Sequence, residues 1–208
     1  MKGLSFSEPM VRAWLEGRKD VTRRLMNPQP EIATDGCFFY PYAIHPKWRC
    51  YANEAHFRKN MMDDFKPRYT PGETVYIKET WMAATPDGGE SFGILYRATL
   101  SKPWTDVQWK QSFKPDNRAE KYFNGKEAWR SPLFMPEWAS RSHARIVSVR
   151  PERIREITRE ELAREGFGGK AGDAYIAFGL LWDKLHGKGN FLNVNPWVWR
   201  IELEKVTV

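Results

Sequence analysis

Lys19 and Thr22 have the types and the spacing of side chains that can act together in catalysis. They lie in the run 17–24, GRKDVTRR, which holds an amine, a hydroxyl and several guanidinium groups. A threonine hydroxyl becomes an effective nucleophile when a nearby base takes its proton, and a lysine amine can be that base if neighbouring cations or burial lower its pKa. A distant carboxylate, Glu79, could then protonate a leaving group or activate water. The three residues predict a site for nucleophilic attack and proton transfer.

The same residues also have an ordinary structural explanation, which stays open at this point. Lys19, Arg23 and Arg24 could be solvated charges beyond the end of a helix, with Glu79 paired to one of them. The negative pole of a helix dipole attracts basic residues even where no function is involved. Spacing alone does not separate the two explanations.

A second group of residues has the chemistry of a zinc site. Its members are Cys37, His45, Cys50 and His56. The tight C-x-x-C or H-x-x-x-H pairs of structural zinc sites are absent, and both cysteines stand among aromatic residues. We therefore interpret the cysteines as buried thiols and expect neither a metal nor an organic cofactor.

A third candidate is a basic stretch from 141 to 155. One edge of a strand in this stretch could present cations to phosphate, and the alternative is a solvated face balanced by Glu152 and Glu156. No glycine-rich phosphate loop, H-E-x-x-H or G-x-S-x-G motif occurs, which disfavours nucleoside triphosphatases, zinc proteases and serine hydrolases. The basic residues are Arg141, His143, Arg145, Arg150, Arg153 and Arg155.

The composition favours a polyanionic partner. The chain of 208 residues has 33 lysines and arginines against 26 acidic residues, a net charge of +7. Such a balance attracts nucleic acid through phosphate contacts and counterion release, although a merely soluble basic protein has the same composition. The ten tryptophans could stack on bases, but most should lie in the core.

The sequence predicts neither a signal peptide nor a membrane-spanning segment, because no apolar run approaches the required length. Two cysteines do not make a disulfide framework, so we expect the reducing cytoplasm. The oligomeric state cannot be predicted from these features.

The apolar pattern predicts the elements that must position the candidate residues. Ser7 caps a helix over 8–16, which Gly17 ends, so the run 17–24 follows the C-terminal end of this helix. A capping box formed by Thr158 and Glu161 opens a short helix that ends near Gly166. The other predicted elements are a helix over 173–186, with Phe178, Leu181, Trp182 and Leu185 as its apolar stripe, and strands at 74–78, 93–97, 143–150 and 197–204.

These elements predict an α+β fold in a single domain over 1–208. Strands do not alternate regularly with helices, which disfavours a doubly wound parallel sheet. A small mixed or antiparallel β-barrel with flanking helices fits the pattern better. Two irregular segments, at about 27–68 and 83–133, are interpreted as insertions, the first of them ordered because its aromatic residues should pack onto the body.

The run 17–24 matches the signature G-x-K-x-x-T-x-R of ASCH domains at every fixed position. Further stretches resemble, in the same order, the large ASCH-domain proteins of phages and prophages. They are Pro71-Gly72-Glu73, Lys78-Glu79-Thr80-Trp81, Trp138-Ala139-Ser140-Arg141 and Asn195-Pro196-Trp197-Val198-Trp199. The resemblance reaches nearly from end to end and leaves the two insertions outside the common domain.

This resemblance implies a PUA-like β-barrel whose cleft binds RNA or a modified nucleoside. Compact bacterial members of the family are N(4)-acetylcytidine amidohydrolases, which use a lysine, a threonine three residues later and a glutamate on a following strand. Carried onto this chain, these residues are Lys19, Thr22 and Glu79, the last depending on an alignment across the 27–68 insertion. Substrate contacts are expected from Arg23, Arg24, Trp81 and Arg141.

The leading hypothesis is therefore hydrolysis of the acetyl amide on the exocyclic amine of N(4)-acetylcytidine or a related nucleoside, without a metal. Lys19 would deprotonate Thr22, and Glu79 would assist the leaving amine or the water. Arg23 or Arg24 could hold the oxyanion or a phosphate. Two alternatives are a ribonuclease and a non-enzymatic RNA-binding module that uses the same basic cleft. The sequence does not distinguish a free nucleoside from an RNA strand as the substrate.

Overall fold

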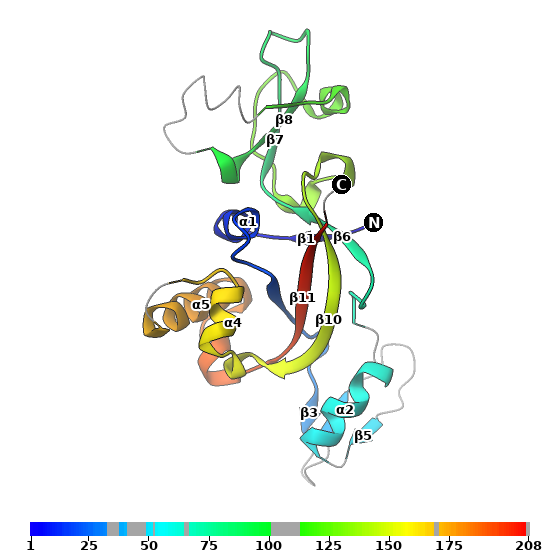
Figure 1. Ribbon diagram of the computed structural model, residues 1–208, viewed down its shortest axis with the longest axis vertical. Helices are drawn as coiled ribbons and strands as arrows, with labels where there is room; N and C mark the ends of the chain where they lie inside the picture. The colour runs from blue at the N-terminus through cyan, green and yellow to red at the C-terminus, as the bar shows by residue number, and fades with distance from the viewer. Residues whose placement is uncertain are drawn as a thin grey trace. The chain divides into compact units, whose positions relative to one another are not determined.

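The computed structural model describes residues 1–32, 38–40, 49–51, 53–64, 67–100, 113–168 and 171–206. The fold is mixed α+β (Figure 1). The chain divides into two compact units, of which the first comprises Met1–Gly17, Thr74–Ala144 and Lys205–Val208 and the second Arg18–Glu73 and Arg145–Glu204. None of the helices in the described ranges has the length and the apolar character that crossing a bilayer requires.

The largest sheet has five strands in the order β1-β6-β10-β11-β2. The order begins with β1 and ends with β2, which are not hydrogen-bonded neighbours, so these strands do not form a closed barrel. The predicted α+β class is confirmed. The prediction of a barrel is wrong, because the sheet is not closed. Strand patterns in a sequence show which segments extend, but not whether the two edge strands of a sheet meet.

In the first unit, β1 (Lys2–Ser5) pairs in parallel with β6 (Thr74–Lys78), and Leu4 lies opposite Ile77. Parallel strands need a crossover connection, and α1 (Glu8–Leu15) lies in the chain between them. The helix begins after Ser7, which is at the N-cap position but makes no capping hydrogen bond with its side chain, and ends before Gly17, which has a φ of +74°. This left-handed conformation suits glycine, so the predicted helix and its stop are both confirmed.

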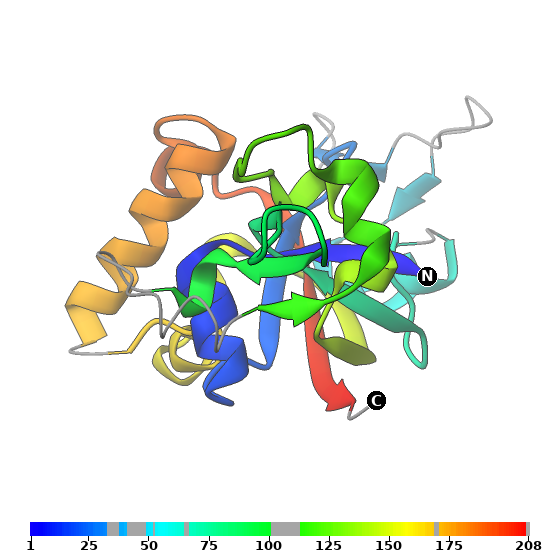
Figure 2. The same cartoon turned by 90° about the horizontal axis from the view of Figure 1, so that it is seen from above.

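A second sheet of the first unit contains β7 (Trp81–Ala84), β8 (Gly93–Tyr96) and β9 (Lys114–Pro115), all antiparallel. The 3-10 helix η2 (Asn117–Tyr122) packs beside the β7–β8 hairpin (Figure 2). Three short 3-10 helices complete this region: η1 (Arg97–Thr99), η3 (Pro132–Phe134) and η4 (Glu137–Ala139). The predicted 83–133 insertion therefore contributes a sheet with its own apolar cluster around Trp81, Ile94 and Tyr96.

In the second unit, β10 (His143–Arg153), which starts in the first unit, continues beside β11 (Trp197–Val206), and β11 pairs antiparallel with β2 (Val21–Leu25). Next to β11 lie α4 (Arg159–Arg164) and α5 (Ala171–His186), as Figure 1 shows. Two short helices, η5 (Ile154–Glu156) and the π-helix η6 (Asn190–Val194), flank them. Their buried side chains form one core: Ile154, Ile157, Leu162, Ala174, Phe178, Trp182, Phe191 and Val198.

The predicted 27–68 insertion belongs to the second unit. It contains a small antiparallel sheet of β3 (Glu31–Ile32), β4 (Phe38–Tyr40) and β5 (Arg49–Tyr51), followed by α2 (Glu54–Asp64). Phe57 of α2 packs edge-on against Trp197 at 4.9 Å between ring centroids. The described part of this segment is thus ordered against the body, as expected. The prediction of one domain over 1–208 stays a prediction.

Most predicted elements are confirmed, with one error in the burial pattern of α5. Phe178 and Trp182 are buried as expected, but Leu185 is 63% exposed. Along β11 the predicted apolar face is buried, and so is Arg200 on the alternate face. Arg200 can be buried because the carboxylates of Glu161 and Glu202 neutralise it.

Candidate active site

Lys19 is held by backbone contacts that join the start of β2 to the end of α4. It forms an isolated antiparallel bridge with Glu165. The next amide, that of Asp20, donates to the carbonyl oxygen of Arg164 at 3.0 Å, and the carbonyl of Asp20 accepts from Leu203 at 2.7 Å. Gly166, with φ +95°, ends α4 directly after Glu165. Residues 146 positions apart in the chain are thereby fixed side by side.

The amine of Lys19 is completely enclosed. Its Nζ donates to Glu165 Oε2 at 2.6 Å, to the carbonyl of Val21 at 2.6 Å and to the carbonyl of Glu165 at 3.0 Å. The side chains of Lys19 and Glu165 are 0% and 2% exposed. Burial lowers the pKa of Lys19, although the Glu165 carboxylate acts in the opposite direction.

Glu165 serves two cations at once. While Oε2 accepts from Lys19, Oε1 accepts from a terminal nitrogen of Arg23 at 3.2 Å. Both carboxylate oxygens therefore have a buried, positively charged donor, and their orientation is fixed from two sides. A buried carboxylate beside a lysine of lowered pKa is an arrangement that can exchange a proton.

Arg23 is the centre of a larger buried network. Its Nε donates to Glu152 at 2.6 Å, and its second terminal nitrogen donates to Glu161 at 2.7 Å. Burial disfavours the charge of Arg23, but the carboxylates around it more than offset this and raise its pKa. Hydrogen bonds from Arg200 and Arg23 overcome the effect of burial and lower the pKa of Glu161 to about 2.

Thr22 supplies a hydroxyl without a hydrogen-bond partner. The residue is 1% exposed, and its Oγ1 is buried and unpaired within the described part of the chain. A buried hydroxyl that lacks a partner is costly, and such groups concentrate at sites that bind a ligand or water. Because Oγ1 is unpaired, it is not hydrogen-bonded to Lys19 Nζ in this structure.

Glu79 lies in the first unit and pairs with Arg141. Nε and a terminal nitrogen of Arg141 donate to the two carboxylate oxygens, each at 2.8 Å. The guanidinium also lies over the ring of Tyr96, 4.2 Å from its centroid, and donates to Thr99 Oγ1 at 3.3 Å. Burial raises the pKa of Glu79, and Arg141 opposes that change. The observed partner of Glu79 is therefore Arg141, whereas the observed carboxylate partner of Lys19 is Glu165.

The remaining predicted substrate contacts are partly or wholly buried. Arg24 is half-buried and donates to the carbonyl of Arg23 at 3.2 Å. Trp81 is 0% exposed and packs against Tyr122 and Trp138, so no face of its ring is open to a base. The substrate-binding roles of these residues stay predictions.

The basic stretch from 141 to 155 is largely neutralised. Nε of Arg145 donates to Glu204 at 3.0 Å, and Nε of Arg150 lies 3.5 Å from Glu152. Arg153 donates to a backbone carbonyl and stacks over Trp197 at 4.5 Å. These contacts match the interpretation as a balanced face, and phosphate binding along it stays a prediction.

The zinc alternative falls mostly outside the described residues. Cys37 and His45 are not described, and Cys50 is described only as a backbone position in β5. His56 lies in α2 and is exposed. Within the ranges given above, no group of three or more metal-ligating side chains comes together.

Sequence reasoning missed Glu165 as the partner of Lys19. Of the predicted capping box, the N-cap half is confirmed, since Thr158 Oγ1 accepts from the Glu161 amide at 3.3 Å, whereas the Glu161 carboxylate accepts from Arg23 and Arg200. Glu161 and Glu165 are one turn apart on the helix that Thr158 caps, so their carboxylates project from one face. That spacing could have marked an acidic face, but nothing local shows that β2 covers it.

Comparison of the chain with protein-family models, with curated proteins and with solved structures finds no match.

Proposed function

We propose that this protein is an amidohydrolase that removes an acetyl group from the exocyclic amine of N(4)-acetylcytidine or a related modified nucleoside. The observation that carries the proposal is the buried Lys19–Glu165 pair, 2.6 Å apart, in the same short segment as the unpaired hydroxyl of Thr22. The ASCH resemblance supplies the substrate class and the PUA-like assignment. The structure adds Glu165 as the carboxylate with a direct contact to the lysine.

A neutral form of the Lys19–Glu165 pair starts the proposed reaction. In a site shielded from water, transfer of the proton from the ammonium to the carboxylate removes two buried charges at once. Burial lowers the pKa of Lys19, which is the direction that a base at this position requires. The product is an amine that can accept a proton and a carboxylic acid that can donate one.

In the acylation step, Lys19 takes the proton of Thr22 while Oγ1 attacks the acetyl carbonyl. The tetrahedral intermediate collapses as the carbon–nitrogen bond breaks. Glu165 gives its proton to the leaving exocyclic nitrogen, which becomes the amine of cytidine. Acetyl-Thr22, the Lys19 ammonium and the Glu165 carboxylate remain.

In the deacylation step, Glu165 takes a proton from water, and the resulting hydroxide attacks the acetyl ester. The carbon–oxygen bond to Thr22 breaks, and Lys19 returns a proton to the hydroxyl as acetic acid leaves. The neutral pair is restored, so all atoms and charges balance over the cycle. No metal or organic cofactor takes part in the proposed steps.

Access to the site requires movement. Lys19, Thr22 and Glu165 are each 1% exposed, and no hydrogen bond joins Lys19 to Thr22. A substrate must therefore displace covering side chains, and Lys19 must give up one of its three acceptors to reach the hydroxyl. Lids and loops that open for substrate are common in enzymes that exclude water from their chemistry.

The test is to incubate the protein with N(4)-acetylcytidine and to quantify cytidine and acetate by liquid chromatography. We expect product from the wild type and a loss of about a hundredfold or more in Lys19→Ala, the usual effect of removing a general base. Thr22→Val should also lose activity, because it keeps the shape and removes the nucleophile. Equal product from wild type and Lys19→Ala would overturn the proposal.

A non-catalytic RNA-binding module is the second candidate. In it the Lys19 network has a structural role only, which agrees with the intramolecular acceptors that the Lys19 amine and the Arg23 guanidinium have. This candidate predicts salt-sensitive RNA binding without turnover of N(4)-acetylcytidine. A ribonuclease would instead cleave an RNA strand and lose that cleavage in Lys19→Ala.

A further inference from the structure

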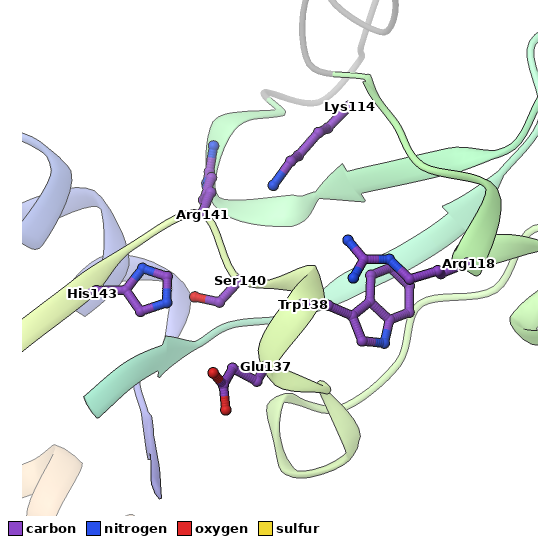
Figure 3. Close-up of a pocket in the computed structure, with 7 residues that line it drawn as sticks. All are labelled: Lys114, Arg118, Glu137, Trp138, Ser140, Arg141 and His143. Carbon is purple, nitrogen blue, oxygen red and sulfur yellow. The ribbon is translucent and has the colours of Figure 1, made fainter. Parts of the chain in front are cut away.

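A pocket of about 620 Å³ lies in the first unit, and none of its lining residues belongs to the Lys19 network (Figure 3). Four elements or their flanks form its wall. Lys114 comes from β9, Arg118 from η2, Trp138 from η4, and Arg141 from the segment that leads into β10. Most of these elements lie in or next to the 83–133 insertion. This volume accommodates a group of the size of a single nucleotide.

The close approach of β8 and β9 positions Lys114. Ile94 pairs with Lys114 in the ladder, and a Cβ on Gly93 would lie 2.4 Å from the Lys114 carbonyl oxygen. Only glycine permits this approach, so the backbone of Lys114 is fixed against the hairpin. In Figure 3 its side chain reaches into the pocket, between Arg141 on one side and Arg118 on the other.

Lys114 brings an exposed positive charge to the pocket, and the carboxylate of Asp116 is close enough to interact with it electrostatically. Arg141 is paired with Glu79, Arg118 with Asp116 at 2.7 Å, and the one acidic side chain of the described lining, Glu137, accepts from the Met1 amine at 2.7 Å. Lys114 is exposed, and its ammonium makes no ion pair or hydrogen bond with the residues that the structure describes. An anion entering the pocket would meet the exposed ammonium of Lys114 and the outer edge of Arg141.

The opposite wall offers a flat surface. The guanidinium of Arg118 lies over the ring of Trp138, 4.8 Å from the ring centroid, and the side chain of Arg118 is 60% exposed. Trp138 is held in place by Trp81 and Tyr122, at 6.5 and 5.8 Å between centroids. Guanidinium planes and aromatic rings are the surfaces on which unpaired bases stack.

We propose that this pocket binds a phosphorylated nucleoside, with the phosphate between Lys114 and Arg141 and the base against the stacked Arg118 and Trp138. The shared chemistry, one phosphate beside one base, is offered both by a free nucleotide and by a nucleotide within an RNA strand. The site is additional to the amidohydrolase proposal and does not depend on it.

The experiment measures binding of two probes to the full chain at several salt concentrations. Cytidine monophosphate is titrated calorimetrically, with cytidine as the probe that lacks the phosphate. A fluorescently labelled single-stranded oligoribonucleotide is followed by anisotropy. The variants are Lys114→Ala and Arg118→Ala, both at exposed positions. The matched control is Lys126→Ala, which removes the same charge from an exposed lysine of the same unit outside the pocket lining.

We expect Lys114→Ala to weaken binding of the phosphorylated probe about fivefold to tenfold and to reduce the slope of log K against log salt by about 1. Arg118→Ala should also weaken binding of the phosphorylated probe, because it removes the stacking surface. Lys126→Ala should bind this probe with nearly the affinity of the wild type. If Lys114→Ala weakens binding of both cytidine monophosphate and the oligonucleotide, a free nucleotide is sufficient as a ligand. If it weakens binding of the oligonucleotide alone, the site binds a nucleotide within an RNA strand. Equal affinity of Lys114→Ala and Lys126→Ala for both probes would overturn the proposal, as would cytidine binding as tightly as cytidine monophosphate.

Discussion

Arg23 is positioned to fix the orientation of Glu165. It binds the carboxylate oxygen that Lys19 leaves free, and its other nitrogens are held by Glu152 and Glu161. A carboxylate locked in this way can direct its second oxygen at the Lys19 amine without first losing side-chain freedom. Arg23 therefore fixes the orientation of Glu165, and its predicted role in holding an oxyanion or phosphate stays a prediction.

Glu161 gives this network a defined dependence on pH. Its pKa is lowered from about 4.5 to about 2 by Arg200 and Arg23. A carboxyl whose pKa is lower in the folded state stabilises the fold above the unfolded value and loses that contribution as the pH falls. The stabilisation by Glu161 should accordingly be complete above about pH 5 and decline between pH 4.5 and pH 2.

The measurement is the melting temperature of wild type and Glu161→Gln from pH 7 down to pH 3. The difference in melting temperature between the two proteins should be largest at neutral pH and should decrease as the Glu161 carboxyl becomes protonated. Glu204→Gln is the comparison for an exposed pair, since Glu204 and its partner Arg145 are both more than half exposed, and its effect should be small throughout. A gap that stays constant down to pH 3 would contradict the assignment.

At the scale of elements, α5 is fixed by the packing of one helix face against η6. Gly179 of α5 is buried, and a Cβ there would lie 2.7 Å from the ring of Phe191. Trp182 Nε1, on the same helix, donates to Asn190 Oδ1 at 2.8 Å, and this hydrogen bond fixes the position of η6 against α5. The close approach of the helix to Phe191 depends on the missing side chain at position 179.

Gly179→Ala should therefore destabilise the protein by about 1–3 kcal/mol, the usual cost of overpacking a core. Gly172→Ala in the same helix is the matched control, because nothing lies within 4 Å of its Cβ position. There the higher helix propensity of alanine should stabilise the protein by up to about 1 kcal/mol. Urea unfolding measures the free energy of unfolding of each variant. Equal changes in that free energy for Gly179→Ala and Gly172→Ala would contradict the packing of Gly179 against Phe191.

The elements that sequence patterns predict best are those with local signals. Gly17 and the N-cap Thr158 mark helix boundaries through backbone chemistry within a few residues. Strand β2 was not predicted, because its charged residues Arg23 and Arg24 hide the alternation of a strand. Arg23 is buried by carboxylates from distant elements, and no local pattern reveals such neutralisation.

The same limit applies to the candidate site. The sequence singles out Lys19 and Thr22 through the spacing of a signature, and both are buried in the structure. Glu165 could not be paired with Lys19 in advance, since 146 residues separate them and the contact depends on how α4 meets the start of β2. Glu79 was chosen by alignment to a following strand, whereas its observed partner is Arg141.

At the scale of the whole molecule, the net charge of +7 does not translate into a uniformly basic surface. Many arginines are neutralised inside the second unit, while the pocket of the first unit has an exposed lysine beside the stacked Arg118 and Trp138. Electrostatic attraction of a polyanion depends on where unpaired charge lies, and not on the total alone. The described residues thus place one set of charges in a buried ion network and another in the lining of a pocket.

The most direct test of the central claim compares Glu165→Gln with Glu79→Gln in kcat/KM for N(4)-acetylcytidine. The two glutamates are matched, because each is 1% exposed and each is paired with one or more buried or partly buried cations. With circular dichroism confirming that both variants fold, Glu165→Gln should lose about a hundredfold or more, the usual effect of removing a general acid–base group. Glu79→Gln should retain most of the wild-type rate. A large loss in Glu79→Gln together with near-wild-type activity in Glu165→Gln would contradict the assignment of Glu165 as the catalytic carboxylate.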